Sequence, residues 1–185
     1  NDCESNEVFM YNPSIMIKLV KSTFYKEKET KKKLSEFINK SEYLSLGPEC
    51  FKFEKNFAKY QGRKYCVFFN SGSSANLALI QSLLNLGRVQ KDNYSAFSAI
   101  SWPTNITPLI QLGLKPIPVD IELETLNVSS KKFGEILKKF PIKVFFITNL
   151  LGFCHDIEKI RQICKKKRII LIEDNCESLG TVYKG

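Results

Sequence analysis

From residue 51 onward, short runs of apolar residues alternate with longer stretches whose apolar residues recur every three or four positions. The short runs are typical of β-strands, and the longer stretches are typical of amphipathic helices. The pattern predicts strands at 64–69, 94–100, 115–121, 143–151 and 168–174. It predicts helices at 51–60, 73–86, 103–113, 129–140 and 156–167. Strand and helix therefore alternate along most of the chain.

The two predicted strands nearest the C-terminus are apolar at successive positions, which indicates that both of their faces are buried. Such strands occur in parallel sheets that helices cover on both sides. Strand 115–121 contains Pro116 and Pro118, which cannot donate to a neighbouring strand, so we expect it at an edge. The predicted fold class is α/β, with a mainly parallel sheet in a three-layer α/β/α arrangement. Residues 1–47 are predicted to form an irregular or helical segment, and residues 48–185 the main domain.

Composition predicts a soluble globular protein, with 43% hydrophobic and 25% charged residues. No run approaches the ~20 apolar residues that cross a bilayer, and the first residues are too polar for a secretory signal. Six cysteines occur without a C-x-x-C pair, which argues against a disulfide framework and favours a cytoplasmic location. A metal site at Cys154, His155 and Cys164 is disfavoured, because zinc ligands are spaced more closely.

The net charge of +9 makes nucleic acid a partner to consider. The lysines form short clusters within or at the end of predicted helices, at 31–33, 131–132, 138–139 and 165–168. No RNA-binding aromatic motif or helix-turn-helix pattern accompanies them. We therefore interpret the clusters as solvated helix faces and expect no nucleic-acid partner and no membrane. A non-catalytic basic module that binds nucleic acid is the alternative.

Polar segments follow four of the predicted strands. They are NSGSS (70–74), SWPTN (101–105), NLLGF (149–153) and EDNCES (173–178). The carboxyl ends of parallel strands lie at one edge of a sheet, where α/β proteins bind their ligands. We therefore expect the four segments to line one site.

The segment NSGSS leads directly into a predicted helix. Gly72 lets the backbone come close to a ligand, and the hydroxyl groups of Ser73 and Ser74 lie at the positive end of the helix dipole. Such a turn can cradle an anion, most often a phosphate. The alternative is a serine that only caps the helix. The complete dinucleotide-binding and P-loop motifs are both absent.

Asp174 ends an apolar strand, so its carboxylate lies at the rim of the sheet and requires a cationic or hydrogen-bonding partner. A protonated pyridine nitrogen is one such partner, as in enzymes that use pyridoxal 5′-phosphate (PLP). Trp102 is the only tryptophan and also follows a strand, where it could stack on a flat ring. Packing in the core is the alternative for Trp102. For Glu177, three residues past Asp174, a simple capping role is the alternative to a role in the site.

Four stretches resemble the DegT/DnrJ/StrS family of PLP-dependent nucleotide-sugar aminotransferases. They are LSLGPECFKFEKNFAKYQGRKYCVFF, NSGSSANLALIQSLL, SWPTNITPLIQLGLKPIPVDIELETLNV and LIEDNCESLG. The resemblance runs in order from about residue 44 to residue 185 and corresponds to roughly the N-terminal half of a family member. It implies the large-domain fold of aspartate aminotransferase, incomplete at the C-terminus, and the cofactor PLP.

The resemblance also implies a role for each candidate residue. Gly72 and Ser73, with Ser74 beside them, match the turn that binds the phosphate of the cofactor. Trp102 matches the aromatic residue that stacks on the cofactor ring, and Asp174 matches the carboxylate at the pyridine nitrogen. Glu177 falls where the family has a His, Gln or Glu near the phenolic oxygen.

One family residue is missing from this sequence. The Schiff-base lysine of the family follows the equivalent of Asp174 by a stretch that is not present, and Lys184 is too close to Asp174. The sugar 3-dehydratases of the family have a histidine at that position, so the sequence does not choose between an aminotransferase and a PLP- or PMP-dependent 3-dehydratase. For the whole protein, the resemblance implies a keto nucleotide-sugar substrate, glutamate as amino donor, a homodimer and a role in polysaccharide or lipopolysaccharide biosynthesis. The 185 residues alone are expected to be inactive.

Overall fold

The computed structural model describes residues 24–154 and 156–183. The chain divides into two compact units, and the division falls between Lys64 and Tyr65. The first unit contains helices α1 (Glu27–Lys40) and α2 (Pro48–Tyr60). This division assigns α2 to the first unit, whereas the sequence suggested a boundary between residues 47 and 48. Residues 1–23 of the predicted N-terminal segment lie outside the described residues.

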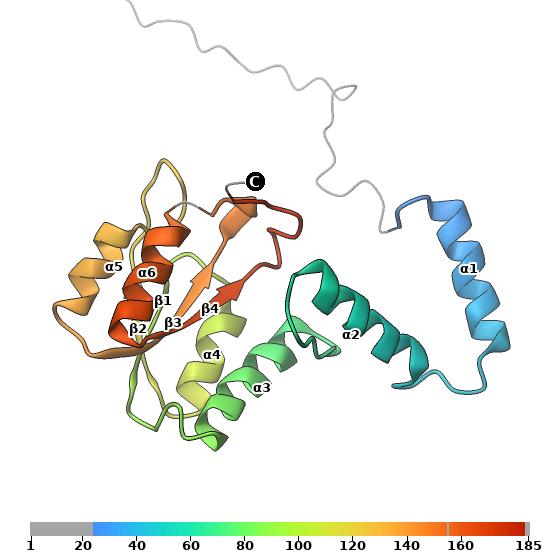
Figure 1. Cartoon of the computed structure of the whole chain (residues 1–185), viewed down its shortest axis with the longest axis horizontal. Helices are drawn as coiled ribbons and strands as arrows, with labels where there is room; N and C mark the ends of the chain where they lie inside the picture. The colour runs from blue at the N-terminus through green and yellow to red at the C-terminus, as the bar shows by residue number, and fades with distance from the viewer. Residues whose placement is uncertain (1–23, 155, 184–185) are drawn as a thin grey trace, which may run out of the picture. The chain divides into compact units, whose positions relative to one another are not determined.

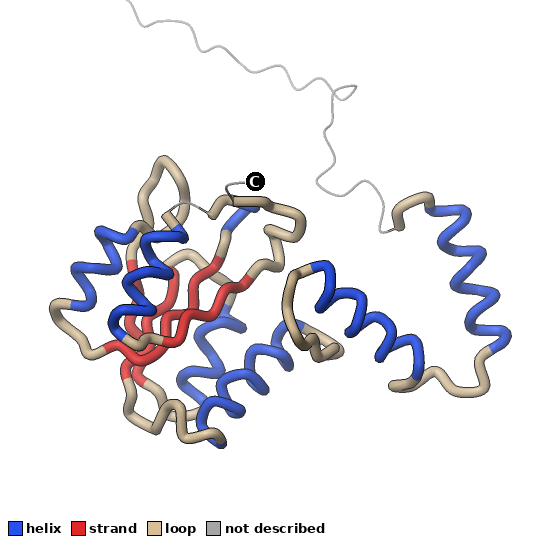
Figure 2. The backbone as a smooth tube through the Cα atoms, viewed as in Figure 1, coloured by secondary structure: helices blue, strands red, loops and turns tan. Residues whose placement is uncertain are grey.

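The second unit is built on a four-stranded parallel sheet with the order β2-β1-β3-β4 (Figures 1 and 2). The strands are β1 (Tyr94–Ser98), β2 (Lys115–Val119), β3 (Ile142–Thr148) and β4 (Ile170–Asp174). The helices are α3 (Gly72–Asn85), α4 (Pro103–Gln111), α5 (Ser130–Leu137) and α6 (Ile157–Lys167), and a short 3-10 turn, η2 (Leu150–Gly152), follows β3.

Strand β3 lies inside the sheet and carries side chains into two hydrophobic cores. Val144 and Phe146 pack on one face with apolar residues of α3 and α4. Phe145 packs on the opposite face with α5 and α6, and its ring stacks on that of Phe133 at 4.2 Å between centroids. Both faces are therefore covered by helices, as Figure 1 also shows. The predicted three-layer arrangement and parallel sheet are confirmed.

Strand β2 lies at an edge of the sheet, as its two prolines predicted. The Lys115 N–H donates to the Asn93 carbonyl, and the Val119 carbonyl accepts from the Ala99 N–H, both at 2.9 Å. Because residues of a strand alternate in direction, Lys115 and Val119 face β1, and the prolines between them face away from it. The missing N–H groups of Pro116 and Pro118 therefore cost the sheet no hydrogen bond.

The predicted strand at 64–69 is wrong, because no part of this segment is a β-strand. Its apolar side chains are largely exposed, with Tyr65 at 75% and Val67 at 68%. Aromatic and β-branched residues favour a strand only where a neighbouring strand and a covered face are available. The composition of the segment therefore predicted an element that the described sheet does not contain.

Several predicted boundaries also shift, and two of these shifts have a clear local cause. Helix α2 begins at Pro48, because proline suits the first turn of a helix and Gly47 precedes it in an extended conformation. Strand β3 ends at Thr148, three residues earlier than predicted. The backbone turns after it, since Leu151 and Gly152 have positive φ angles of 54° and 85°. The apolar character of LLGF therefore belongs to a loop at the edge of the sheet.

The lysine cluster at 31–33 lies on α1, where each lysine pairs with a glutamate one turn away. Exposed pairs of this spacing stabilise a helix by only a few tenths of a kcal/mol. The cluster is therefore a solvated helix face, as interpreted from the sequence. Among the described helices, we find none with the length and apolar character required to span a membrane.

Asp156 joins the start of α6 to the start of α5. One carboxylate oxygen accepts a hydrogen bond from the Ser130 N–H at 2.8 Å, and the other pairs with the Lys159 amine at 3.0 Å. Burial raises the pKa of Asp156, but the hydrogen bonds from Ser130 and the pairing with Lys159 outweigh it and hold the pKa below its usual 3.8. The ionised carboxylate therefore stabilises the folded state.

Asp156→Ala is expected to lower the free energy of unfolding by about 1–3 kcal/mol, because Ser130 at the first turn of α5 loses its acceptor. Since the folded pKa is depressed, the charged carboxylate stabilises the protein above pH ~3.8 and this contribution is lost as the pH falls through the folded pKa. Urea unfolding followed by circular dichroism at pH 7 and pH 3 measures both effects. A variant whose loss of stability is equal at both pH values would contradict the assignment. Asp156→Asn, which tolerates the positive φ of 60°, is the matched control.

Candidate functional site

The serine turn opens helix α3 with an extended residue, Ser71, as its cap. The Ser71 hydroxyl oxygen accepts from the Ser74 N–H at 3.2 Å, and the Ser71 hydroxyl also contacts the Ser74 hydroxyl at 3.2 Å. The first N–H groups of a helix, here those of Gly72 and Ser73, have no acceptor inside the helix. Ser71 is therefore a plain serine cap, the alternative considered from the sequence. The backbone N–H groups of Gly72 and Ser73 remain without an acceptor inside the helix and point toward its N-terminal end.

A chain of side-chain hydrogen bonds connects this turn to the sheet. The Asn76 amide on α3 donates to the Thr104 carbonyl at 3.2 Å and to the Asn105 side-chain carbonyl at 3.1 Å. Asn105 is completely buried on α4, and its amide donates to the Thr148 hydroxyl at 2.9 Å. A buried amide is stable only when its hydrogen-bonding groups are paired. This series of hydrogen bonds therefore fixes how α3 and α4 are oriented against the end of β3.

Thr148 carries the connection on to Asp174. It is the last residue of β3 and lies in register with Asp174, the last residue of β4. Its N–H donates to the buried Ser98 hydroxyl at the end of β1 at 3.0 Å. The serine turn, the residues after β1 and Asp174 therefore belong to one edge of the sheet. The sequence analysis predicted this shared edge and included Asn105 in the segment 101–105, but it gave Asn105 no role and missed Asn76. The signal that could have found them is an asparagine among apolar residues in each helix.

Asp174 keeps one carboxylate oxygen available. Its Oδ1 accepts from the Cys176 N–H at 3.0 Å, and its backbone carbonyl accepts from the Asn149 N–H at 3.0 Å. The residue is half-buried, and the described part of the structure has no lysine or arginine paired with it. A carboxylate in this position can accept a hydrogen bond from a cationic group of a ligand.

Trp102 is 54% exposed, so it does not serve as core filling. It precedes Pro103, the first residue of α4, in the loop after β1. The hydroxyl oxygen of its neighbour Ser101 is buried and has no hydrogen-bond partner among the described residues. An exposed indole and a buried, unpaired hydroxyl next to each other are suited to a planar, polar ligand.

Glu177 has a defined contact elsewhere. Its Oε2 accepts from the Leu151 N–H at 2.8 Å, and the nearby Thr181 hydroxyl donates to the Gly152 carbonyl at 3.0 Å. Both bonds connect the segment after β4 to η2, where the positive φ angles lie. In this structure Glu177 holds a loop in place, and its role near a cofactor stays a prediction.

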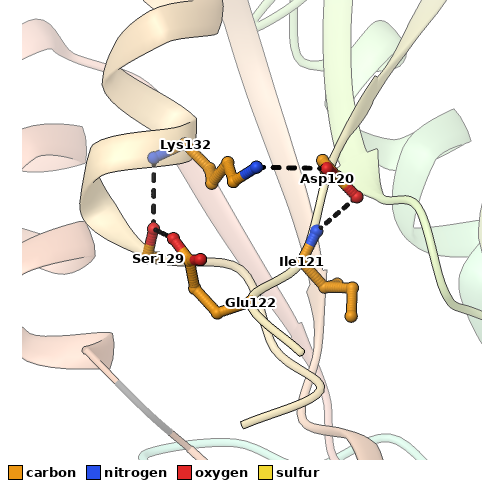
Figure 3. A network of polar contacts seen from close by, with 5 residues as sticks. All are labelled: Asp120, Ile121, Glu122, Ser129 and Lys132. Atoms are coloured by element: carbon orange, nitrogen blue, oxygen red, sulfur yellow. Dashed lines mark hydrogen bonds and ion pairs between the residues drawn. The ribbon is translucent and has the colours of Figure 1, made fainter. Parts of the chain in front are cut away.

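Another carboxylate, Asp120, follows β2 (Figure 3). It accepts from the Ile121 N–H at 2.9 Å and pairs with the Lys132 amine of α5 at 3.1 Å. The hydrogen bond from Ile121 and the pairing with Lys132 lower the pKa of Asp120. The Ser129 hydroxyl, which caps α5, donates to Glu122 at 2.7 Å. Both acids already have partners, so the group connects β2 to α5 and is not a candidate catalytic site.

The disfavoured metal site gains no support. The described residues contain no group of three His, Cys, Asp or Glu side chains suited to a metal ion, and His155 lies outside them. Burial raises the pKa of the Cys164 thiol to about 12, and a thiol must ionise to bind zinc. Cys164 belongs to the hydrophobic core between α6 and the sheet.

The available groups fit PLP. Gly72 and Ser73 offer N–H donors at a helix N-terminus. Apart from the chain neighbours of Gly72 and the backbone of its own helix, no atom lies within 4 Å of the position that a Cβ at Gly72 would take. Ser73 and Ser74 also line an open cavity of about 280 Å³ with residues of α4. Asp174 offers a carboxylate oxygen for a protonated ring nitrogen, and Trp102 offers an exposed aromatic face.

Comparison with known proteins identifies the class. The chain belongs to the DegT/DnrJ/EryC1/StrS aminotransferase family, whose model matches residues 25–185. The fold resembles that of E. coli GDP-4-keto-6-deoxy-D-mannose-3-dehydratase with bound hydrated PLP, with a TM-score of 0.81 and 33% identity. The similarity covers 90% of this chain and 42% of that one. The predicted aspartate aminotransferase-like fold is therefore confirmed.

Two curated relatives represent two activities of the family. The GDP-4-keto-6-deoxy-D-mannose 3-dehydratase of Yersinia pseudotuberculosis is 36% identical over 147 residues, which are 78% of this chain and 37% of that protein. The UDP-2-acetamido-2-deoxy-3-oxo-D-glucuronate aminotransferase of Pseudomonas aeruginosa is 31% identical over 140 residues, 76% and 38% of the two chains. The chain thus spans less than half the length of the relatives it matches.

Asn105→Ala is expected to reduce the free energy of unfolding by about 1–3 kcal/mol, because it removes the donor to the buried Thr148 hydroxyl and one of the two acceptors of the Asn76 amide. Urea titration monitored by circular dichroism measures the loss. The matched control is Gln81→Ala, which removes an exposed amide contact to Asn85 at 2.7 Å and should change stability by only about 0.5 kcal/mol or less. Equal effects of the two changes would refute a special role for the buried chain.

Proposed function

We propose that residues 48–185 form the cofactor-binding portion of a PLP-dependent aminotransferase. The whole enzyme acts on a keto nucleotide-sugar, with glutamate as the amino donor. The observation that carries the proposal is the chain from Asn76 through Asn105 to Thr148, in register with Asp174. These contacts connect helix α3, which begins with the serine turn, to the edge of the sheet where Asp174 lies, which supports a site formed by both. Membership of the aminotransferase family supports the same function.

Each candidate residue has one task in this proposal. The N–H groups of Gly72 and Ser73 and the Ser73 hydroxyl bind the phosphate group, with the helix dipole favouring its negative charge. Trp102 stacks on the ring and fixes its plane. Asp174 accepts the hydrogen bond from the ring nitrogen and keeps that nitrogen protonated. When bound, PLP supplies a ring that accepts electrons from the reacting substrate.

A 3-dehydratase is the second candidate function. The observation that favours it is the 36% identity to the Yersinia 3-dehydratase, compared with 31% to the Pseudomonas aminotransferase. The residue that separates the two activities follows Asp174 in the family and is not in this sequence. Sequencing the gene beyond the codon for Gly185 distinguishes them: a lysine at that position supports the aminotransferase and a histidine supports the 3-dehydratase.

We further propose that the whole enzyme is a cytoplasmic homodimer. Helix α1 supports an interface, because Leu34, Phe37 and Ile38 share one face of the helix and are each more than 40% exposed. Analytical ultracentrifugation of the protein tests the association. A monomer at all concentrations would remove this part of the proposal without affecting the cofactor site.

Asp174→Asn is expected to weaken PLP binding by the 185-residue chain roughly 10- to 100-fold, the value of a hydrogen bond to a charged group. Fluorescence titration with PLP gives the dissociation constant. Asp120→Asn is the matched control, since that carboxylate follows a different strand and already has partners. Unchanged affinity in Asp174→Asn, or equal losses in both variants, would refute the assigned role. No measurable PLP binding by the unaltered chain would favour a non-catalytic α/β module.

Borohydride reduction of the chain with PLP is expected to label no single lysine preferentially, because the family's reactive lysine is absent from the sequence. Mass spectrometry of the digested protein locates the labelled positions. Stoichiometric labelling of one lysine that Asp174→Asn prevents would show that the 185 residues carry a reactive amine of their own. The chain would then be capable of chemistry without the family's lysine.

A further inference from the structure

A second cavity, which is lined by basic residues, lies at the amino ends of the strands, away from the edge that carries Asp174. It has a volume of about 410 Å³, within the usual range for small-molecule sites. Its lining comes from the turn after α3, the residue before β1, the start of β3 and the start of β4: Gly87, Arg88, Val89, Gln90, Asn93, Lys143, Arg168 and Ile170. The cofactor proposed above does not use any of these residues.

Three of the lining residues are cations and none is an acid. In the described part of the chain, Arg88, Lys143 and Arg168 form no ion pair with a carboxylate. Each is exposed, so the charges remain hydrated until a ligand arrives. Three unpaired positive charges around one cavity repel one another, and an anion between them removes that repulsion.

The cavity is held by fixed backbone turns. Arg88 follows a glycine with a φ of 64°, and its N–H donates to the Leu83 carbonyl at 2.9 Å, the arrangement of a helix C-terminal motif. The Asn93 side chain accepts from the Gln90 N–H at 3.0 Å and closes the next turn. Arg168 ends α6 in a left-handed conformation, with a φ of 56°.

Helix dipoles explain only part of this charge. Arg88 and Arg168 follow helix C-termini, where a cation is favoured whatever the residue binds. Lys143 is the second residue of β3, so no helix terminus accounts for it. Its presence in the lining of the same cavity as the two arginines is the feature that points to a ligand.

We infer that this cavity is a binding site for a diphosphate group, either inorganic pyrophosphate or the diphosphate of a nucleotide. A phosphate monoester carries about −1.5 to −2 charges at pH 7, so two linked phosphates match three cations better than one does. The arginines can bind phosphate oxygens through two N–H groups each, and Lys143 contributes a point charge. The Gln90 and Asn93 side chains add uncharged hydrogen-bonding groups at the rim.

Isothermal titration calorimetry of the 185-residue chain with pyrophosphate tests the site. One molecule is expected to bind, and Arg88→Gln, Lys143→Gln and Arg168→Gln should each weaken binding at least about fivefold. Lys139→Gln is the matched control, because Lys139 follows the end of α5 as Arg88 follows that of α3 but lies outside the cavity. Wild-type affinity in Lys143→Gln would overturn the proposal, as would no binding at millimolar pyrophosphate.

Two further arms separate this site from the serine turn and identify the ligand. Ser73→Ala should bind pyrophosphate normally, and a loss there larger than that in Lys143→Gln would place the anion at α3 instead and overturn the inference. Tighter binding of ADP than of pyrophosphate supports a nucleotide, and equal binding supports the diphosphate group alone. Circular dichroism of each variant confirms that the fold is unchanged, so that a loss reports on the site.

Discussion

The candidate site depends on the two hydrogen bonds that the buried side-chain amide of Asn105 makes. It accepts from Asn76 on α3 and donates to Thr148 at the end of β3, at 3.1 and 2.9 Å. Each helix of this layer packs on the sheet through apolar side chains, which fix its distance but not its rotation or register. A pair of directional hydrogen bonds in a buried position removes that freedom. The serine turn at the start of α3 is thereby held relative to Asp174.

The two ends of the sheet differ in chemistry. The carboxyl ends of the strands carry Asp174, the exposed indole of Trp102 and the N-terminus of α3, which together suit a phosphorylated aromatic cation. The amino ends carry Arg88, Lys143 and Arg168 around a cavity without an acid. A parallel sheet makes this separation possible, because all its strands begin at one edge and end at the other. One layer of strands therefore supports two candidate sites that do not overlap.

Much of this arrangement was predictable from local sequence. The uninterrupted apolar runs of β3 and β4 indicated burial on both faces, and the prolines of β2 indicated an edge. The polar segments after the strands indicated one shared site. Local sequence did not show which distant segments come into contact. The segment 64–69, for example, has the composition of a strand but does not pair with a neighbouring strand. Asn76 and Asn105 lie 29 residues apart, and their contact exists only once the helices pack. The basic cavity escaped for the same reason, since its cations lie on three separate elements.

Because of the prolines in β2, the two edges of the sheet differ in their ability to pair with an added strand. Pro116 and Pro118 face away from β1, so the outer margin of β2 lacks the two N–H groups that an added strand would need there. At the other margin, Asp174 faces β3, so Leu171 and Glu173 direct their N–H groups outward. Enlargement of this sheet, by a segment of the same polypeptide or by another molecule, is therefore favoured only beside β4. Association of two copies through their β2 edge strands is disfavoured, because proline has no backbone N–H to donate.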